Sequence, residues 1–250
     1  MQLFLFLFLF LFSSLSFSAN IQAKSWLIAD EEGKIIEYEN IEISQPIASI
    51  TKLMTAMVVL DSNPNLNTPI SKKFRGMTIT KKQLIDLAVV KSDNVAAKLL
   101  CETYHKGYHG CINDMNLKAQ ILGMENTRFE DSSGLDNRNV STPRDLIKLL
   151  LAAERYPEIV NASNQISINL MKKKKRKLSK LNFTNTNPLV AKYNVIVSKT
   201  GYVRASGGCL VMSAIINGKK KLYIILNSKT TRTRIHDMES LILLGIENKL

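Results

Sequence analysis

Ser49-Ile50-Thr51-Lys52 combines a hydroxyl and an amine at a spacing that permits nucleophilic catalysis. Residues three apart share one face of a helix, so the Ser49 and Lys52 side chains can meet. A serine in the first helical turn also keeps its backbone N–H free of intrahelical bonding, and that N–H can point at an oxyanion. The pattern occurs once in the chain, although a single copy could arise by chance on an amphipathic helix.

The chemistry requires Lys52 to be uncharged, because only a neutral amine can accept the serine proton. The pKa of a lysine must therefore fall by about three units from its ordinary value of about 10.4. Burial and a nearby second cation can lower a lysine pKa that far, whereas the helix dipole contributes only about 1 kcal/mol. The sequence thus predicts a buried lysine with another cation close to it.

Two further patterns carry groups that can assist such a nucleophile. Ser92-Asp93-Asn94 lies at a break between two helical stretches, where a hydroxyl and an amide could relay a proton and bind a substrate amide. Plain N-capping of a helix is the alternative explanation of that tripeptide. Lys199-Thr200-Gly201 ends an apolar strand and offers a cation, a hydroxyl donor and a residue that lets a substrate backbone lie close. Taken alone, it could also be an ordinary strand end with a solvated lysine.

The rest of the sequence predicts the elements that position these residues. Apolar residues at helical spacing, capping patterns and alternating β-type runs give the assignments. Helical patterns occupy residues 48–60, 80–90, 94–104, 142–156 and 234–246, and strand patterns occupy residues 25–37, 194–201, 208–216 and 221–228. Strands from both chain ends can share one antiparallel sheet with helices over its faces. We therefore expect one α/β (α+β) domain over residues 20–250, with the helical middle as an insert.

The composition and the N-terminus indicate an exported globular protein. The chain has 250 residues, is 45% hydrophobic and carries a net charge of +13, so it is neither disordered nor fibrous and suits an anionic partner. Residues 3–12 read LFLFLFLFLF and small polar residues follow, which predicts a signal peptide over residues 1–19 rather than a membrane anchor.

Export permits disulfides. Cys101 and Cys111 flank nine residues read as a loop and could pair, leaving Cys209 as a buried thiol, but three reduced cysteines are equally compatible with the sequence.

The order of the three patterns carries more information than any one of them. S-x-x-K on a helix, S-D-N at a helix junction and K-T-G on a strand form the motif set of penicillin-binding proteins and class A β-lactamases. The chain resembles the low-molecular-weight penicillin-binding proteins, the D-alanyl-D-alanine carboxypeptidases and endopeptidases, and is most similar to the endopeptidase type. The resemblance runs from about residue 47 to residue 245 and includes ASITKLMTAMVVLD, LGMENTRFEDSSGLD, NTNPLV and SKTGYVRASGGCLVMSA.

The resemblance implies a β-lactamase/transpeptidase-like fold, with a five-stranded antiparallel sheet flanked by helices, and a role for each motif residue. Ser49 would be the acylated nucleophile and Lys52 its base, with Ser92 and Asn94 assisting proton transfer and substrate placement. Lys199 would support the electrostatics and Thr200 and Gly201 would line the substrate strand. The N–H groups of Ser49 and Tyr202 would form the oxyanion hole, each typically worth about 3 kcal/mol of barrier. Arg204 is a further candidate, for binding a substrate carboxylate. No metal or cofactor is implied.

Two departures from the family pattern, and one difference from the class A β-lactamases, lead to further expectations. Ser49 and Ser92 lie closer in the chain than is usual in the family, which predicts a trimmed helical insert and a more open cleft. The sequence ends soon after its last predicted helix, so we expect neither the β-rich domain nor the amphipathic anchor of many carboxypeptidases, and hence a soluble exported, periplasmic or extracytoplasmic protein. Where class A β-lactamases carry a hydrolytic glutamate, the aligned residue is a serine and Glu130 lies before it. β-Lactams are therefore expected to acylate Ser49 and to leave slowly.

Two other features suggest sites that we do not favour. Lys172, Lys173, Lys174, Lys175, Arg176 and Lys177 form a basic run, which is best explained as a solvated loop or hairpin near the cleft. The run could also attract an anionic wall polymer or a membrane surface, but nucleic-acid binding lacks interleaved aromatic residues. His105 and His109 are four apart, yet no H-E-x-x-H motif accompanies them, so a pair of loop histidines is favoured over a zinc site.

The sequence leaves two alternatives to a serine peptidase acting on the D-alanyl peptide bonds of peptidoglycan. One is a wall sensor or scaffold on the same fold that becomes acylated by β-lactams without turnover. The other is a basic module that binds an anionic polymer, which would depend on Lys172–Lys177 rather than on Ser49. Release of D-alanine or cleavage of cross-linked muropeptides distinguishes the peptidase from both.

Overall fold

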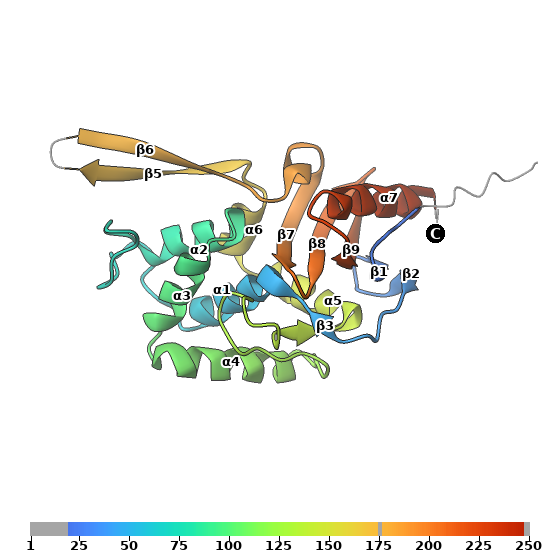
Figure 1. Ribbon diagram of the computed structural model, residues 1–250, viewed down its shortest axis with the longest axis horizontal. Helices are drawn as coiled ribbons and strands as arrows, with labels where there is room; N and C mark the ends of the chain where they lie inside the picture. Colours follow the sequence, from blue (N-terminus) through green and yellow to red (C-terminus); the bar gives the residue numbers. More distant parts are fainter. Residues whose placement is uncertain (1–19, 175–176, 248–250) are drawn as a thin grey trace, which may run out of the picture.

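The computed structural model describes residues 20–174 and 177–247 (Figure 1), so the expected signal peptide at residues 1–19 lies outside the described part. A five-stranded antiparallel sheet has the order β2-β1-β9-β8-β7. Its strands are β1 (Ser25–Asp30), β2 (Ile35–Glu39), β7 (Asn194–Val203), β8 (Gly207–Ile216) and β9 (Lys219–Ser228). The expected sheet built from both chain ends is therefore confirmed, and β7, the strand with the Lys199 motif, forms one of its edges.

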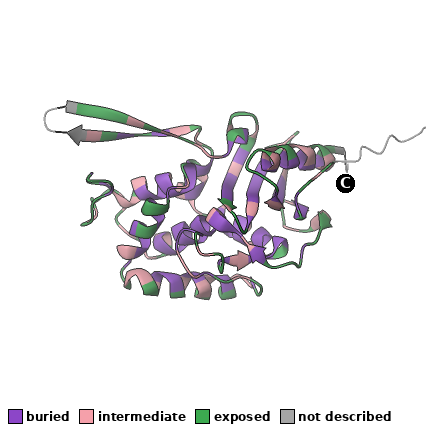
Figure 2. Ribbon diagram, viewed as in Figure 1, coloured by how far each residue is buried: buried purple, intermediate pink, exposed green. Residues whose placement is uncertain are grey.

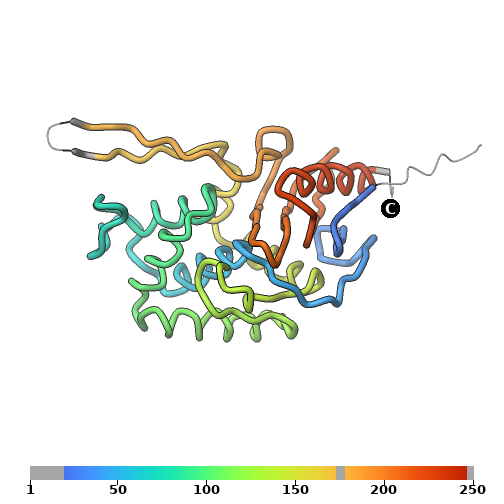
Figure 3. The backbone as a smooth tube through the Cα atoms, in the orientation of Figure 1, coloured from blue at the N-terminus to red at the C-terminus, as the bar shows by residue number. Residues whose placement is uncertain are grey.

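Successive side chains of a strand point to opposite faces of the sheet, and both faces of this sheet carry apolar side chains. Other elements therefore pack on both faces. Ile28, Met212 and Tyr223 pack with the C-terminal helix α7 (Thr233–Glu247), whereas Leu27 and Val211 belong to the larger core on the other face. Figure 3 shows how this brings the first and the last described parts of the chain side by side. Helix α1 (Thr51–Asp61) lies inside the larger core and is buried over most of its length (Figure 2). The 3₁₀ turn η1 (Ala48–Ile50) precedes it.

The remaining helices lie between β2 and β7 in the sequence. They are α2 (Lys81–Val90), α3 (Asn94–Glu102), α4 (Gly107–Ile121), α5 (Pro143–Ala153) and α6 (Pro157–Ser163). The predicted capping patterns are confirmed: Thr80 and Gln83 form a capping box on α2, and Thr142 caps α5 with Pro143 in the first turn. Two short strands, β3 (Gln45–Pro46) and β4 (Val140–Ser141), pair with each other, and a second 3₁₀ turn, η2 (Pro188–Ala191), precedes β7.

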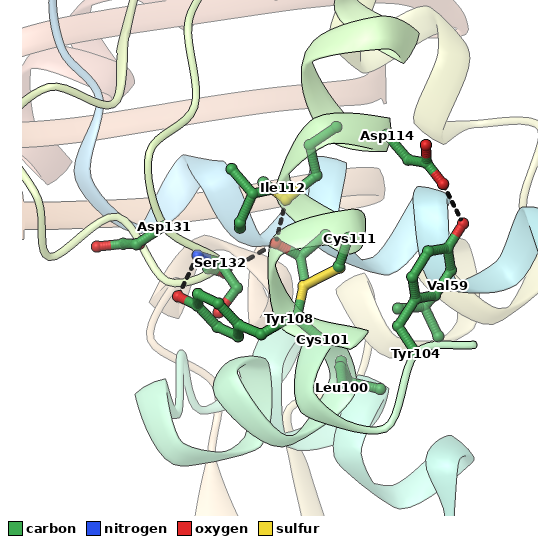
Figure 4. The surroundings of a disulfide bond; sticks show 12 residues. Val59, Leu100, Cys101, Tyr104, Tyr108, Cys111, Ile112, Asp114, Asp131 and Ser132 are labelled. Atoms are coloured by element: carbon green, nitrogen blue, oxygen red, sulfur yellow. Dashed lines mark hydrogen bonds between the residues drawn. A yellow bond between two sulfur atoms is a disulfide. The ribbon is translucent and has the colours of Figure 1, made fainter. Parts of the chain in front are cut away.

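The segment between Cys101 and Cys111 differs from the expectation. The sequence predicts a loop there, but α4 begins at Gly107, so Cys111 and His109 lie on a helix. Cys101, near the end of α3, forms a disulfide with Cys111, and Cys209 is a buried free thiol. The disulfide therefore joins two helices across a short turn (Figure 4).

The described residues of the basic run, Lys172, Lys173, Lys174 and Lys177, lie on the two strands of a hairpin, one of the two forms expected for the run, and Lys175 and Arg176 lie outside the described residues. Strands β5 (Ser167–Lys174) and β6 (Lys177–Thr184) pair from Ser167–Thr184 to Lys174–Lys177, and the hairpin projects from the body of the molecule (Figure 1). Its base is held by Ile168 and Leu170, which are buried in the larger core. No helix in the described ranges is long and apolar enough to cross a bilayer.

Candidate active site

Ser49 lies in the 3₁₀ turn η1, where the chain enters the buried helix α1. The turn is held by close backbone packing on two sides. Gly134 has a φ of +81°, and a Cβ there would lie 1.8 Å from the Ala48 carbonyl oxygen. A Cβ at Gly201 would lie 2.8 Å from the Ile47 carbonyl oxygen and 3.1 Å from the Ser49 nitrogen. Glycine is therefore required at both positions, and it lets β7 pass directly beside the Ser49 backbone.

Lys52 is fully buried one helical turn after Ser49. Its Nζ donates to three acceptors: the Oγ of Ser49 at 2.7 Å, the Oδ1 of Asn94 at 2.7 Å and the carbonyl of Ser133 at 2.6 Å. These contacts come from η1, from the first residue of α3 and from the loop after α4. The amine predicted to activate the serine is thus within hydrogen-bonding distance of it.

Burial lowers the pKa of Lys52 from 10.5 to about 7, while the charges of Asp131 and Asp93 act in the opposite direction. Lys199 of β7 is also buried, and its Nζ donates to the Thr200 carbonyl at 2.9 Å. Burial is the main cause that lowers the pKa of Lys199, followed by the charges of Lys52 and Arg234. Both lysines are therefore buried in one site, and the charge of Lys52 disfavours a proton on Lys199.

The Ser92-Asp93-Asn94 segment joins α2 to α3. Ser92 has a φ of +59°, which turns the chain sharply between the two helices. Asp93 caps α3 by accepting from the Ala96 N–H at 2.9 Å. The N-capping role that the sequence offered as an alternative is therefore confirmed for Asp93. The cap fixes the start of α3, whose first residue, Asn94, contacts Lys52.

An open pocket collects most of the predicted residues at the edge of the sheet. Thr200 lies on its wall, where its hydroxyl meets that of Thr186 at 2.6 Å. The pocket is lined by Ser49, Ser92, Asn94, Leu135, Thr186, Thr200, Gly201, Tyr202, Val203, Thr231 and Arg234. Larger pockets lie elsewhere, for example between α4 and residues 124–130 and between β2 and α5, and none of the motif residues lines either of these two.

Arg204 does not line this pocket, contrary to the expectation. It lies exposed in the turn between β7 and β8, whereas Arg234 at the start of α7 is 7% exposed and lines the pocket. Nη1 of Arg234 donates to the Gly201 carbonyl at 2.9 Å, and its buried Nε has no hydrogen-bond partner within the described ranges. No sequence pattern indicates Arg234, because its contact with Gly201 of β7 forms only in the tertiary fold.

The loop after α4 also contributes groups that the sequence analysis did not identify. The Asp131 carboxylate accepts from the backbone N–H groups of Ser133 at 2.6 Å, Gly134 at 2.5 Å and Asp136 at 2.6 Å. The turn built around Asp131 points the Ser133 carbonyl at Lys52 and places Gly134 against η1. Tyr108 of α4 accepts from the Ser132 N–H at 3.4 Å (Figure 4). The Asp131 carboxylate, at the centre of a tight loop, therefore fixes the loop that forms one wall of the site.

Other candidate groups lie away from the pocket. Glu130 pairs with Arg128 at 2.5 Å and lines the separate pocket beside α4. His105 lies in the turn before α4 and His109 lies on α4, and the described residues include no group of three His, Cys, Asp or Glu side chains that could hold a metal ion.

Comparison with known proteins places this geometry in a family. The family model described as D-alanyl-D-alanine carboxypeptidase matches residues 13–230. The D-alanyl-D-alanine endopeptidase of Escherichia coli is 37% identical over 238 residues, covering 88% of this chain and 76% of that protein. The D-alanyl-D-alanine endopeptidase of Pseudomonas aeruginosa is 35% identical over 242 residues, covering 90% of this chain and 77% of that protein.

Solved structures agree with the sequence comparisons. A Streptomyces DD-transpeptidase superimposes with a TM-score of 0.82 at 26% identity, covering 91% of this chain and 98% of that one. The ampicillin-bound penicillin-binding protein of Listeria monocytogenes gives a TM-score of 0.77 at 26% identity, covering 90% of this chain and 98% of that one. The fold, the matched motifs and these relatives together show that the chain belongs to the D-alanyl-D-alanine carboxypeptidase family of serine peptidases.

Proposed function

We propose that the protein cleaves D-alanyl peptide bonds of peptidoglycan through an acyl-enzyme on Ser49, and that cross-links between stem peptides are its preferred substrates. The observation that carries the proposal is the contact between the buried, low-pKa amine of Lys52 and the Ser49 hydroxyl at 2.7 Å. The preference for cross-links is supported by relatives at 35–37% identity that are named endopeptidases.

In this proposal the neutral amine of Lys52 takes the proton from Ser49 as the Oγ attacks the D-alanyl carbonyl carbon. The backbone N–H groups of Ser49 and Tyr202 stabilise the negative charge on the carbonyl oxygen. When the C–N bond breaks, a proton passes to the leaving amine, and Ser92 and Asn94 assist that transfer. Water then hydrolyses the ester, which releases the D-alanyl carboxylate and restores Ser49.

Arg234 is the better candidate for binding a substrate carboxylate. Its guanidinium lines the pocket, is nearly buried and has an unpartnered Nε among the described residues. Burial lowers the pKa of Arg234, but an arginine pKa starts so high that the group stays charged. A buried cation without an ionic partner favours an anionic ligand. Thr200 offers a hydroxyl donor in the same pocket, so the two can bind one carboxylate together.

The experiment that tests this function uses purified muropeptides of defined structure. The mature protein is incubated with monomers ending in D-alanyl-D-alanine and with cross-linked dimers, and the products are identified by mass. We expect dimers to become monomers faster than monomers lose D-alanine, and Ser49→Ala to do neither. Identical products from wild type and Ser49→Ala would exclude the proposed catalysis, whereas loss of D-alanine alone would leave a carboxypeptidase.

We further propose that residues 1–19 act as a signal peptide, that residues 20–250 form one catalytic domain, and that the protein works outside the cytoplasm. The apolar run and the small residues after it support the first point. The disulfide between Cys101 and Cys111 supports an oxidising location. N-terminal sequencing of the protein from an exporting host should find a start near Ala19; a start at Met1 would exclude cleavage.

The basic run Lys172–Lys177 is proposed to add weak attraction to an anionic wall polymer or a membrane surface. The net charge of +13 and the projection of the β5–β6 hairpin from the body of the molecule support this (Figure 1). Such attraction would raise the local concentration of the enzyme at its polymeric substrate without changing the chemistry at Ser49.

A further inference from the structure

Asp93 uses its two carboxylate oxygens for different purposes. Oδ1 caps α3 by accepting from the Ala96 N–H, and Oδ2 lies 2.6 Å from Nη2 of Arg75. The Asp93 side chain is only 5% exposed, whereas that of Arg75 is 54% exposed. A nearly buried carboxylate beside the catalytic centre is thus neutralised by a guanidinium from a different segment of the chain.

Arg75 is held in place by the turn in which it lies. Phe74 and Met77 exchange backbone hydrogen bonds of 3.0 and 2.8 Å around Arg75 and Gly76, which both have positive φ values of +49° and +79°. This is the geometry of a tight two-residue turn, in which a non-glycine residue at positive φ is uncommon. Phe74 is fully buried and anchors the turn in the core, and the Arg75 guanidinium lies 5.0 Å from the centre of its ring. The turn therefore presents the guanidinium to Asp93 from a fixed base.

Few charged side chains lie on the elements that pack around Lys52. Asp93 and Asn94 come from the α2–α3 junction, Asp131 and the Ser133 carbonyl from the loop after α4, and Lys199 from β7. Of the charged groups among them, the two carboxylates favour a proton on Lys52. Asp131 is stabilised by the backbone N–H groups of its own loop, whereas the ionic partner of Asp93 is Arg75.

We propose that Arg75 is a positioning residue of the peptidase reaction, which neutralises Asp93 and so favours the uncharged form of Lys52. The same ion pair steadies the start of α3, from which Asn94 reaches the Lys52 amine. Arg75 does not line the pocket that contains Ser49, and it acts only through Asp93. The inference rests on the proposed function, because it requires Lys52 to be the base.

The test measures the second-order rate constant for acylation of the full mature protein by a fluorescent penicillin across the pH range in which Lys52 titrates. Arg75→Gln removes the charge and keeps a hydrogen-bond donor, and Arg75→Lys keeps the charge. We expect Arg75→Gln to move the acidic limb of the profile upward by about half a pH unit, the size that a partly exposed ion pair supports. Arg75→Lys should stay close to wild type, and the alkaline plateau should change less than about twofold in both.

Lys72→Gln is the matched control, because Lys72 belongs to the same segment and pairs with Glu102, at the other end of α3, at 2.7 Å. It removes the same charge and should leave the limb in place. Asp93→Asn provides a second check, since asparagine is also a good helix cap. It should move the limb downward, and Arg75→Gln should have no further effect in that background.

The inference is wrong if Arg75→Gln leaves the limb unmoved, if Lys72→Gln moves it equally, or if only the plateau falls. It is also wrong if Arg75→Gln still moves the limb when Asp93 is asparagine. Failure of the proposed function would show in the wild type itself, as absence of acylation at Ser49 or of an acidic limb. The two failures are therefore distinguishable in one set of measurements.

Discussion

At the scale of single residues, the site depends on what burial does to Lys52. A lysine in water is almost wholly charged at neutral pH and cannot accept a proton. Enclosure by α1, α3 and the loop around Asp131 lowers the pKa of Lys52 to about 7, and its three hydrogen-bond acceptors keep it beside Ser49. Burial thus makes Lys52 a weaker base but leaves a large part of it uncharged near neutral pH, and the uncharged form is the one that can accept a proton.

This predicts the pH dependence of Ser49 acylation. Because the folded-state pKa of Lys52 is lowered to about 7, the neutral form dominates above that pH and disappears below it. The rate constant for acylation by a penicillin should rise about tenfold per pH unit on the acidic side and level off above about pH 7. Stopped-flow fluorescence checks the profile, with the far-ultraviolet circular dichroism spectrum confirming that the protein stays folded. A midpoint near the ordinary lysine value would contradict the assignment of the base.

The two arginines near the end of β7 provide a matched comparison. Arg234→Gln should raise the KM for muropeptides about 10- to 100-fold, because a hydrogen-bonded charged partner is worth about 1.5–3 kcal/mol. Arg204→Gln should change it less than about twofold, since that residue is exposed outside the pocket. Steady-state kinetics on a single muropeptide measure both. Equal effects of the two substitutions would contradict the assignment of Arg234 to the substrate carboxylate.

The motif residues could be predicted from the sequence because the residues of each motif lie close together along the chain. Ser49 and Lys52 share one turn, and Ser92 and Asn94 lie two apart at a helix junction. Arg234 has no such pattern: its contact with Gly201 spans 33 residues and forms only when α7 packs on the sheet. Arg204 lies three residues after Gly201 in the sequence, but closeness in sequence says nothing about the direction in which a turn residue points.

At the scale of elements, helices with clear caps and strands with alternating apolar residues were predictable, but α4 was not. Two glycines and two histidines near its start resemble a loop, and Gly107 at a φ of +70° does begin the helix abruptly. What stabilises α4 is tertiary: Tyr108 contacts the loop of Ser132, and Cys111 is joined to Cys101 of α3. A hairpin was one of the forms expected for the basic run, but the extent of β5 and β6 was not predicted, because consecutive lysines hide the alternation of apolar residues in their outer halves.

Removing the disulfide between α3 and α4 tests whether tertiary contacts stabilise α4. It closes a loop with a sequence separation of 10 residues, for which the chain-entropy model gives about 2–3 kcal/mol. Reduction should lower the free energy of unfolding by that amount, and Cys101→Ser/Cys111→Ser should be as stable as the reduced wild type. Urea unfolding with and without reductant measures the difference. Cys209→Ala is the control, since it must keep the full redox effect; a redox effect that depends on Cys209 would contradict the pairing.

The projecting hairpin can be tested without disturbing the site. Changing Lys172, Lys173 and Lys174 to glutamine should weaken co-sedimentation with anionic vesicles or wall polymer at low salt, because the attraction is electrostatic and screened. Cleavage of soluble muropeptides should not change. The control variant changes Lys24, Lys34 and Lys229, three exposed lysines elsewhere. If the two triple variants lose binding equally, net charge rather than the hairpin is responsible.

At the scale of the whole molecule, the fold brings three distant segments to one sheet edge. The proposed nucleophile Ser49 comes from the turn η1 and its proposed base Lys52 from the buried helix α1. The proposed proton relay comes from the α2–α3 junction, and the wall of the pocket comes from β7, the edge strand of the five-stranded sheet. The sheet itself needs both ends of the chain, since β1 pairs with β9. Local sequence patterns predicted the sheet but could not give the distances at which these segments meet.

The central claim is that Ser49 is the nucleophile, and identification of its covalent adduct tests it most directly. The mature protein is treated with benzylpenicillin, digested and examined by tandem mass spectrometry, with Ser49→Ala treated in parallel. We predict one penicilloyl group, carried by Ser49, that persists through the digestion, and no adduct on the variant. A penicilloyl group on any other side chain, or equal labelling of Ser49→Ala, would contradict the account.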